Sequence, residues 1–422
     1  MDSKKKDSHL PDYAIVERQE MLRGVGYGDE AIERPQIGVA SSWGEVNPAS
    51  IHLDRVTAAV KAGVWAAGGT PREFVISSIC TSMAGNDRYH LPHRDLVAGY
   101  IETVAETNLF DGLVCVPICD DVIPAHLMAA ARLNLPSVFV TGGYMQLNRH
   151  KGEVLEPLDI APVHFADFKA DKISPAEFGR IKERGCMGTG ACPVMGTANT
   201  MAAMAEALGM TFPGHTTVPG ADSHLLRIAF KAGQQVVQLH SQNIKPANIM
   251  TEAAFRNAIR LLMAIGGSTN AVLHLQAIAS ELDLEIEPQT FNELSRTTPF
   301  ICDVIPSGPG NNHLGILDEA GGIQAVMKEL QPLLDADVLT VTGNSLSQNL
   351  AKVDPGDRNV IHSLETPLSS EGGLIFLRGN LAPGGGLIKK SAVPAEMLQH
   401  RGSARIFATE EQACDALNEN TI

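Results

Sequence analysis

Short apolar runs alternate with longer amphipathic segments over the first third of the chain. The run at residues 36–41 (QIGVAS) suits a buried parallel strand, and apolar residues then recur at helical spacing from Leu53 to Val64. A second apolar run, at residues 73–77, comes shortly after a pair of glycines that would end this helix. A strand, a helix and a strand joined by short glycine links indicate a βαβ unit.

The same rhythm continues to the end of the first third and then loosens. We expect helices at residues 92–107 and 125–133, and strands at residues 112–117 and 137–141. Prolines and mixed charge at residues 153–179 indicate an insertion or a connection between subdomains. The sequence therefore predicts an α/β fold with doubly wound, mostly parallel sheets and flanking helices.

The second half of the chain is predicted to be mainly helical. Thr251 is a suitable helix N-cap, and the apolar ladder of Phe255, Ile259 and Leu262 after it is typical of an amphipathic helix. We expect helices at residues 200–208, 221–232, 251–264 and 271–282, and strands at residues 338–341 and 374–377.

The composition is that of a globular protein with room for more than one domain. The chain has 422 residues, of which 44% are apolar and 19% are charged. We expect a cytoplasmic protein, because no apolar run is long enough to span a membrane and the first residues lack the apolar centre of a signal peptide. The net charge of −15 would repel phosphate backbones, which argues against nucleic acid as a partner.

The cysteines point to metal binding or catalysis. There are seven, an odd number, and structural disulfides are not expected in a cytoplasmic protein. Cys192 lies in a glycine-rich stretch at residues 185–209, just before an expected helix N-terminus, where the helix dipole would favour the reactive thiolate. The alternative is a buried and inert Cys192. The cysteines expected to be structural are Cys115, Cys186, Cys302 and Cys414.

Three loops are candidates for chemistry, because ligands of open α/β sheets collect beyond the carboxyl ends of the strands. One of them is the Cys192 loop. The other two follow residues 73–77 and 112–117, and they carry Cys80, Asp87, His90 and His93, and Cys119, Asp120, Asp121 and His126, respectively. Thiolates suit an iron–sulfur cluster, and adjacent carboxylates suit a hard divalent cation. The two adjacent aspartates could instead cap the next helix, and the histidines could be surface or helix-start residues.

Eight segments of the chain resemble, in order, the blocks of one enzyme family. They are SWGEVNPASIHLDRVTAAVKAGVWAAGGTPREF, PICDDVIPAHLMAAARLNLPSVFVTGG, ACPVMGTANTMAAMAEALGM, PGADSHLLR, AIGGSTNAVLHLQAIA, PSGPG, LTVTGNSLSQN and GGLIFLRGNLAPGGGLIK. The family is that of the dihydroxy-acid and phosphogluconate dehydratases. The resemblance implies a hydro-lyase that removes water from a 2,3-dihydroxy acid or a sugar acid, as in branched-chain amino acid biosynthesis, and it implies a homo-oligomer.

The resemblance also implies two cofactors. In the family, three cysteines hold an iron–sulfur cluster, here expected to be 2Fe–2S, whose open iron acts as a Lewis acid, and a nearby Mg²⁺ helps to orient the substrate. Cys119 and Cys192 match two of the three cysteines, whereas Ala49 stands at the third. Asp120 matches a magnesium-binding aspartate. Asp121 replaces a neighbouring lysine that is carbamylated in relatives and binds Mg²⁺.

Other positions depart from the family pattern or match it only as loops. The family's other early aspartate has no counterpart, because ISSIC stands there. We expect Cys80 to stand in for the missing cysteine, which gives a predicted metal set of Cys80, Cys119, Cys192, Asp120 and Asp121. Within the GGSTN segment, substrate-binding residues are expected at Ser268, Thr269 and Asn270.

The resemblance divides the chain into three parts. Residues 1–34 are expected to be a tail and lead-in, residues 35–375 the α/β domain with a subdomain break near 150–180, and residues 376–422 the start of a truncated β-rich domain. In the family that domain closes over the site and brings a serine base and another magnesium ligand. Two hypotheses follow. The chain is a hydro-lyase that uses its own base or a separate lid protein, or it is a catalytically inactive relative that acts as a scaffold or partner subunit.

Overall fold

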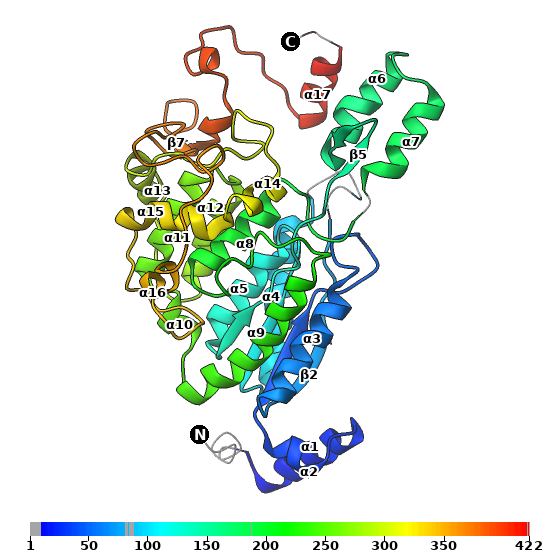
Figure 1. The fold of residues 1–422 in the computed structure, drawn as a ribbon, viewed down its shortest axis with the longest axis vertical. Coiled ribbons are helices and arrows are strands. Elements are labelled where there is room, and N and C mark those ends of the chain that lie inside the picture. The colour runs from blue at the N-terminus through cyan, green and yellow to red at the C-terminus, as the bar shows by residue number, and fades with distance from the viewer. Residues whose placement is uncertain (1–9, 81–82, 84–87, 187, 420, 422) are drawn as a thin grey trace. The chain divides into compact units, whose positions relative to one another are not determined.

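The computed structural model describes residues 10–80, 83, 88–186, 188–419 and 421. The chain divides into two compact units, Met1–Ser391 and Ala392–Ile422. The larger unit contains the strands and almost all of the helices (Figure 1). The smaller unit contains a short 3₁₀ helix, η8 (Ala395–Met397), and α17 (Glu410–Asn418). The domain boundary predicted after residue 375 stays a prediction.

A four-stranded parallel sheet lies at the centre of the larger unit. Its strands are β1 (Gln36–Ser41), β2 (Thr70–Val75), β3 (Gly112–Val116) and β4 (Ser137–Phe139), in the order β2-β1-β3-β4. Ile37 of β1 pairs with Pro71 on one side and Gly112 on the other. Every residue of β1 and β3 is buried, as expected of central parallel strands. The predicted α/β fold is confirmed.

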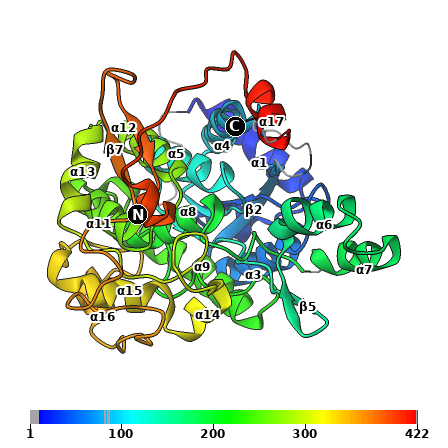
Figure 2. The ribbon, with the colours of Figure 1, turned by 90° about the horizontal axis from the view of Figure 1, so that it is seen from above.

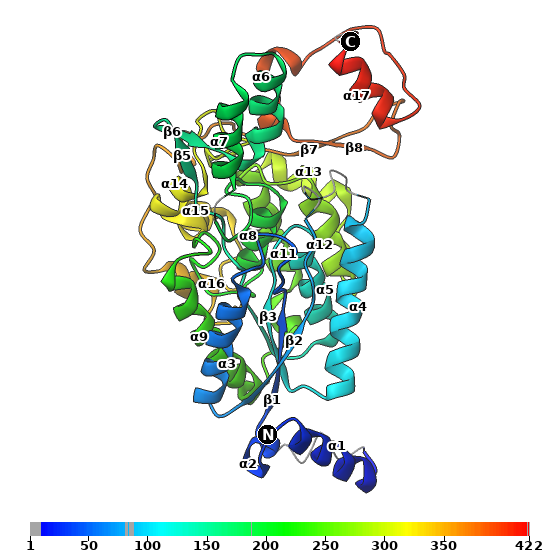
Figure 3. The same ribbon diagram turned by 90° about the vertical axis from the view of Figure 1, so that its right-hand side faces the viewer.

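Two pairs of helices cover the two faces of this sheet (Figure 3). α3 (Leu53–Ala66) and α9 (Ser223–Gln242) lie on one face, and α4 (His90–Asn108) and α5 (Val122–Leu133) lie on the other. Glycines allow α3 and α9 to approach closely. A Cβ atom added at Gly63 would lie 1.9 Å from the Phe230 carbonyl oxygen, and one at Gly233 would lie 2.1 Å from that of Val60.

A layer of helices behind α5 enlarges the core. It contains α8 (Thr197–Ala207), α11 (Glu252–Ala264), α12 (Asn270–Ser280), α13 (Pro288–Arg296) and α15 (Gly322–Leu330). Every residue of α8 is buried, which is typical of a helix surrounded by other elements. The side chain of Thr251 accepts a hydrogen bond from the Ala254 amide, so the predicted cap of α11 is confirmed.

The segment between β4 and α8 folds outside these layers. It forms a hairpin of β5 (Asn148–His150) and β6 (Glu153–Leu155), then the short helices η4 (Pro157–Asp159), η5 (Ile160–Phe165) and α6 (Ala166–Lys169), and finally α7 (Pro175–Gly185). Figure 2 shows α6 and α7 on the opposite side of the larger unit from α11 and α13. Here the loosened sequence pattern corresponds to short elements followed by one longer helix, α7.

The remaining predicted strands have different outcomes. The strand predicted near residues 374–377 is confirmed as β7 (Ile375–Leu377), which pairs antiparallel with β8 (Gly386–Ile388). The strand predicted at residues 338–341 is wrong. Thr340 instead closes a tight turn, in which its amide and its hydroxyl both donate to the Asn344 carbonyl at 3.0 Å. The apolar side chains around it are used to anchor this turn and not to extend a sheet.

The other elements are peripheral to the site. They are α1 (Asp12–Gly24), α2 (Asp29–Glu33), α10 (Pro246–Ile249), α14 (Leu314–Glu319), α16 (Leu346–Leu350), η6 (Gln331–Leu333) and η7 (Lys390–Ala392). Over the part of the chain that the structure describes, none of the helices combines the length and the apolar character needed to cross a membrane.

Candidate functional site

The strand order places a switch point between β1 and β3. The chain leaves these two neighbouring strands towards opposite faces of the sheet, and such a point is where open α/β sheets bind ligands. The loop after β1 carries Asn47 and Ala49, and the loop after β3 carries Cys119, Asp120 and Asp121. The predicted site residues of the first half of the chain therefore come to one edge of the sheet.

Cys119 is held in an unusual backbone conformation at this edge. Its φ angle is +72°, in the left-handed region that non-glycine residues rarely adopt, and its side chain is buried. The chain turns here from β3 into α5. A buried cysteine in a strained turn at a ligand-binding edge is typical of a functional position.

The thiols of three predicted metal ligands lie close enough to affect one another. Burial is the main cause that raises the pKa of Cys119, followed by the nearby charges of Asp120, Cys80 and Cys192. Burial likewise raises the pKa of Cys192 to about 12, with further contributions from Asp120 and Cys80. The structure thus brings together Cys80, Cys119 and Cys192, which the sequence places in three separate loops.

Two expectations about the Cys192 loop need correction. The sequence suggested that the helix dipole would favour the Cys192 thiolate, but burial and the nearby Asp120 raise its pKa and favour the neutral thiol. Cys186 was expected to be only structural, yet it is exposed and near enough to Cys80 that the two groups interact electrostatically. The signal available in the sequence was its position six residues before Cys192 in the same glycine-rich loop.

The chemistry of these groups fits an iron–sulfur cluster better than a single ion. Within the described residues, no three His, Cys, Asp or Glu side chains lie close enough to hold one metal ion. The thiols nevertheless share one edge with Asp120, and all of these groups repel one another when ionised. A positively charged centre would offset that repulsion and the cost of burial. Clusters of this kind are held by thiolates.

Asp121 has a partner that the sequence did not reveal. Its side chain is completely buried, and its Oδ2 lies 2.5 Å from Nδ1 of His93. Nε2 of His93 lies 3.2 Å from the Ser77 carbonyl oxygen. Burial lowers the pKa of His93, but the hydrogen bond and charge of Asp121 outweigh this effect and leave it raised. Oδ1 of Asp121 has no hydrogen-bond partner among the described residues.

The helix-cap alternative can be judged for Asp121. The residue occupies the N-cap position of α5, but its side chain makes no capping hydrogen bond. The carboxylate instead contacts His93 of α4, where α4 packs on α5. The alternative that the Asp121 side chain caps α5 is therefore wrong. Asp87, another candidate, lies outside the described residues.

A pocket of about 490 Å³ opens beside this pair. Most of its lining is apolar, with a few polar groups that converge, a combination typical of small-molecule sites. Its lining residues are Val46, Asn47, Ser77, Ser78, Ile79, Cys80, Met83, Tyr89, Pro92, His93 and Leu96. We call it the His93 pocket.

Asn47 joins the two loops where the sequence departs from the family pattern. Its amide nitrogen donates to the Ser78 hydroxyl at 3.0 Å, and its Oδ1 accepts from the Ala49 amide at 3.0 Å. Ala49 is thereby fixed in a buried turn, beside the segment that carries Ser78 where the resemblance expects an aspartate. The polar side chains here already bond to one another.

The expected substrate-binding residues contact the start of α8, which in turn contacts Cys192. They do not line either of the two cavities described here. The Ser268 hydroxyl is 2.9 Å from the Thr197 hydroxyl, and the Asn270 amide donates to the same hydroxyl at 3.1 Å. The same first turn of α8 carries Asn199, which donates to the Cys192 carbonyl at 2.6 Å. Thr269 is the N-cap residue of α12. Substrate binding by Ser268, Thr269 and Asn270 stays a prediction.

Three further side chains serve packing. Cys115 and Cys302 are completely buried, which agrees with the expectation that they are structural. His126 was expected at the surface or at a helix start, but it lies buried within α5, 3.4 Å from the Ser42 hydroxyl. Burial lowers its pKa to about 3, so it is neutral at physiological pH.

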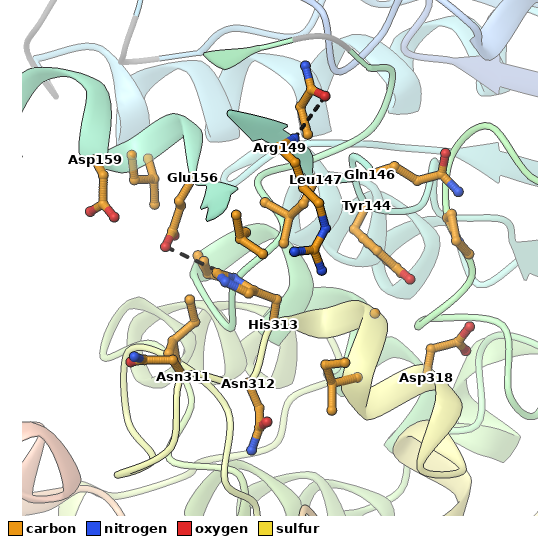
Figure 4. Close-up of a pocket in the computed structure, with 18 of the residues that line it drawn as sticks. Tyr144, Gln146, Leu147, Arg149, Glu156, Asp159, Asn311, Asn312, His313 and Asp318 are labelled. Atoms are coloured by element: carbon orange, nitrogen blue, oxygen red, sulfur yellow. Dashed lines mark hydrogen bonds and ion pairs between the residues drawn. The ribbon is translucent and has the colours of Figure 1, made fainter. Parts of the chain in front are cut away.

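A second and larger cavity, of about 1240 Å³, borders the other side of the Cys192 loop (Figure 4). Tyr144 lines it and forms a β-bridge with Ala191, the residue before Cys192. Figure 4 shows Arg149, Tyr144 and His313 around its middle, with Glu156 on one side and Asp318 on the other. Sequence reasoning missed this cavity, because its walls come from the hairpin β5-β6 and from residues 305–319.

The larger cavity has an acidic lining. It contains the carboxylates of Glu156, Asp159, Asp318 and Glu319, against the single guanidinium of Arg149. Burial, with the nearby charge of Asp159, raises the pKa of Glu156 to about 6, and its carboxylate lies 4.0 Å from Nδ1 of His313. An acidic lining is unfavourable for an anionic substrate, whereas the lining of the His93 pocket contains the thiol of Cys80 and the ring of His93 and no carboxylate among the described residues.

Two family models together match most of the chain. Residues 34–349 match the dihydroxy-acid/6-phosphogluconate dehydratase N-terminal model, and residues 359–422 match the corresponding C-terminal model.

Several relatives align over nearly the whole chain. The chain is 44% identical to a dihydroxy-acid dehydratase of Moorella thermoacetica, over 98% of this chain and 75% of the relative. It is 42% identical to that of Caldicellulosiruptor saccharolyticus, over 96% of this chain and 74% of the relative. It is 43% identical to that of Desulfosudis oleivorans, over 99% of this chain and 76% of the relative.

Proposed function

The chain belongs to the dihydroxy-acid/6-phosphogluconate dehydratase family, and on that premise we propose that it is a hydro-lyase acting on a 2,3-dihydroxy acid or a sugar acid. The observation that carries this proposal is the convergence of Cys80, Cys119 and Cys192 at the switch point of the sheet. These thiols come from three different loops, and one of them, Cys80, lines a pocket of a size suited to a small molecule.

We propose that these three thiols hold an iron–sulfur cluster of the 2Fe–2S type. When bound, such a group supplies a Lewis acid that weakens the bond to a leaving hydroxyl. The chain's own contribution is to keep Cys119 buried and Cys192 half-buried, and to place Cys80 at the pocket, since Ala49 offers no ligand. The apolar walls of the pocket exclude water from a bound acid, and the hydroxyls of Ser77 and Ser78 can donate hydrogen bonds to it. No base is assigned among the described residues.

Magnesium does not fit at Asp121. Its Oδ2 is held by His93, and the segment ISSIC stands where the resemblance expects another aspartate. No step of the proposed reaction therefore passes through a metal ion at Asp121. A homo-oligomer and a separate lid protein stay predictions.

A second candidate function is a relative without catalytic activity, acting as a scaffold or partner subunit. Two specific observations favour it. Ala49 stands in a buried turn at the position of the third family cysteine, and Asp121 is used in a pair with His93. Groups in an active site act as a unit, so the loss of several would reduce the rate by orders of magnitude.

Iron and acid-labile sulfide, measured per chain after anaerobic purification, separate the two functions. We expect both in the wild-type protein and in Cys414→Ala, a control that removes an exposed thiol of the smaller unit. We expect both to be lost in Cys80→Ala. If the wild type contains iron and Cys80→Ala does not, the wild-type protein should then be tested for formation of a 2-keto acid from 2,3-dihydroxy acids and sugar acids. Wild-type protein without iron would contradict the proposal and favour the scaffold.

A further inference from the structure

The two ring nitrogens of His93 face groups that can only accept hydrogen bonds. Nδ1 lies 2.5 Å from the carboxylate of Asp121, and Nε2 lies 3.2 Å from the backbone carbonyl of Ser77. Neither an ionised carboxylate nor a carbonyl has a proton to donate. Both contacts are satisfied together only when both ring nitrogens carry a proton, which is the charged form of histidine.

The charge balance of Asp121 requires such a partner. Its side chain has no exposure to solvent, and a buried ionised carboxylate is costly unless several hydrogen bonds or a positive charge compensate it. Asp121 has one close partner among the described residues, so its compensation has to come from a positive charge, on a cationic side chain or a metal ion. The hydrogen bond at Oδ2 indicates that it comes from the side chain here.

We propose that His93, which lines the pocket, takes the place of a divalent cation at the buried Asp121, so that this carboxylate forms an ion pair with His93 and is not a magnesium ligand. Both nitrogens of His93 are used in hydrogen bonds, so the ring has no lone pair left for a metal. The inference concerns the pocket of the proposed function but does not depend on the reaction proposed for it.

The pair has a consequence for substrate binding. A divalent cation on a carboxylate leaves a net charge of about +1 at that place, whereas a histidinium on a carboxylate leaves none. An acid bound in the His93 pocket therefore gains little attraction from Asp121 and its partner. Its carboxylate would rely on neutral donors, such as the hydroxyls of Ser77 and Ser78 in the lining.

The first test measures metal binding with Mn²⁺, which is visible by electron paramagnetic resonance and binds where Mg²⁺ binds. We expect no Mn²⁺ site in the wild-type protein that depends on Asp121. We expect His93→Ala to gain such a site, seen as at least a tenfold tighter Mn²⁺ binding and a rise of Tm on adding Mn²⁺. Both changes should disappear in the double variant His93→Ala, Asp121→Asn.

His90→Ala is the matched control, and the protonation state of the His93 ring is a second measurement. His90→Ala removes a histidine one turn earlier on α4 and should behave like the wild type. In wild-type protein with ¹⁵N-labelled histidine at pH 7, we expect both ring nitrogens of His93 to be protonated, with the resonances assigned by their loss in His93→Ala. A wild-type Mn²⁺ site that is lost in Asp121→Asn, or a singly protonated His93, would overturn the inference. The iron measurement tests the proposed function separately.

Discussion

Two buried carboxylates, Asp121 and Glu206, are balanced in different ways. Glu206 lies on α8 and is 4% exposed. It accepts hydrogen bonds from the Gly214 amide at 2.8 Å, from Gln324 at 2.5 Å, and from the amide and the hydroxyl of Thr216. Asp121 has one close partner, His93, and one oxygen without a partner among the described residues.

The difference separates a structural carboxylate from one in a site. The donors to Glu206 are all neutral, and they tie α8 to residues 214–216 and to α15, so this network fixes the packing of three segments. Asp121 is balanced by the charge of His93, a residue that lines a pocket, and one of its oxygens has no partner among the described residues. Fully satisfied buried groups rigidify a core, whereas partly satisfied ones are frequent at functional sites.

The largest effect is expected when the charge pair is broken on one side. His93→Ala leaves a buried carboxylate without its partner, which should lower the free energy of unfolding by about 3–5 kcal/mol. The double variant with Asp121→Asn should lose less than His93→Ala alone, because no uncompensated charge remains. Urea denaturation of the four proteins in this cycle measures the difference. Equal losses in the single and double variants would mean that the pair is not an ion pair.

A smaller effect is expected from Glu206→Gln. The amide group of glutamine cannot accept from all four donors, so one buried donor is left unpaired, at a cost of about 1–3 kcal/mol in the free energy of unfolding. The iron content should stay at the wild-type level, because Glu206 is outside the thiol edge. Loss of iron in this variant would show that the two regions are not separate.

The pH dependence of Glu206 sharpens the comparison. Burial raises its pKa, and the hydrogen bonds of Thr216, Gly214 and Gln324 only partly oppose this. A group with a raised pKa contributes stability that is fully present below its unfolded pKa of about 4.5 and is lost as the pH rises through the folded value. The stability of the wild type relative to Glu206→Gln should therefore fall as the pH rises above about 4.5. A rising difference in urea titrations would contradict this account.

Glu177 on α7 should give the smallest effect, with the opposite sign. Hydrogen bonds from His150, Lys151 and Arg180 lower its pKa to about 2. Its contribution to stability is present above about pH 4.5 and is lost as the pH falls towards 2. Thermal unfolding of wild type and Glu177→Gln should converge in acid and diverge near neutrality. A Tm difference that does not change between pH 3 and 7 would refute this assignment.

The sequence predicted the elements that local patterns determine. β1 has the predicted bounds of residues 36–41, because its mostly apolar sequence suits a strand that is buried on both faces. β2 begins at Thr70 and not at residue 73, since its first residues include Pro71 and read as a turn. α9 extends ten residues beyond the predicted end at residue 232, where polar residues interrupt its apolar face but the helix continues along the sheet to Gln242.

The contacts of the site depend on packing between distant segments, which a single sequence does not reveal. His93 and Asp121 are 28 residues apart and meet only because α4 packs on α5. Cys186 reaches Cys80 because the glycine-rich loop folds back against Tyr144, where a Cβ atom at Gly190 would lie 2.4 Å from the backbone. The convergence of Cys80, Cys119 and Cys192 was predictable, because all three follow strand ends or lie in one marked loop.

The central claim, that the thiols at the switch point hold an iron–sulfur cluster, is tested most directly by a pair of variants on one strand and its loop. Cys119→Ser removes a proposed ligand, and Cys115→Ser removes a fully buried core thiol four residues earlier. Visible absorption and iron and sulfide analysis under anaerobic conditions measure the cluster. We predict about two irons and two sulfides per chain in wild type and Cys115→Ser, and none in Cys119→Ser. Wild-type protein without iron, or equal iron in both variants, would contradict the account.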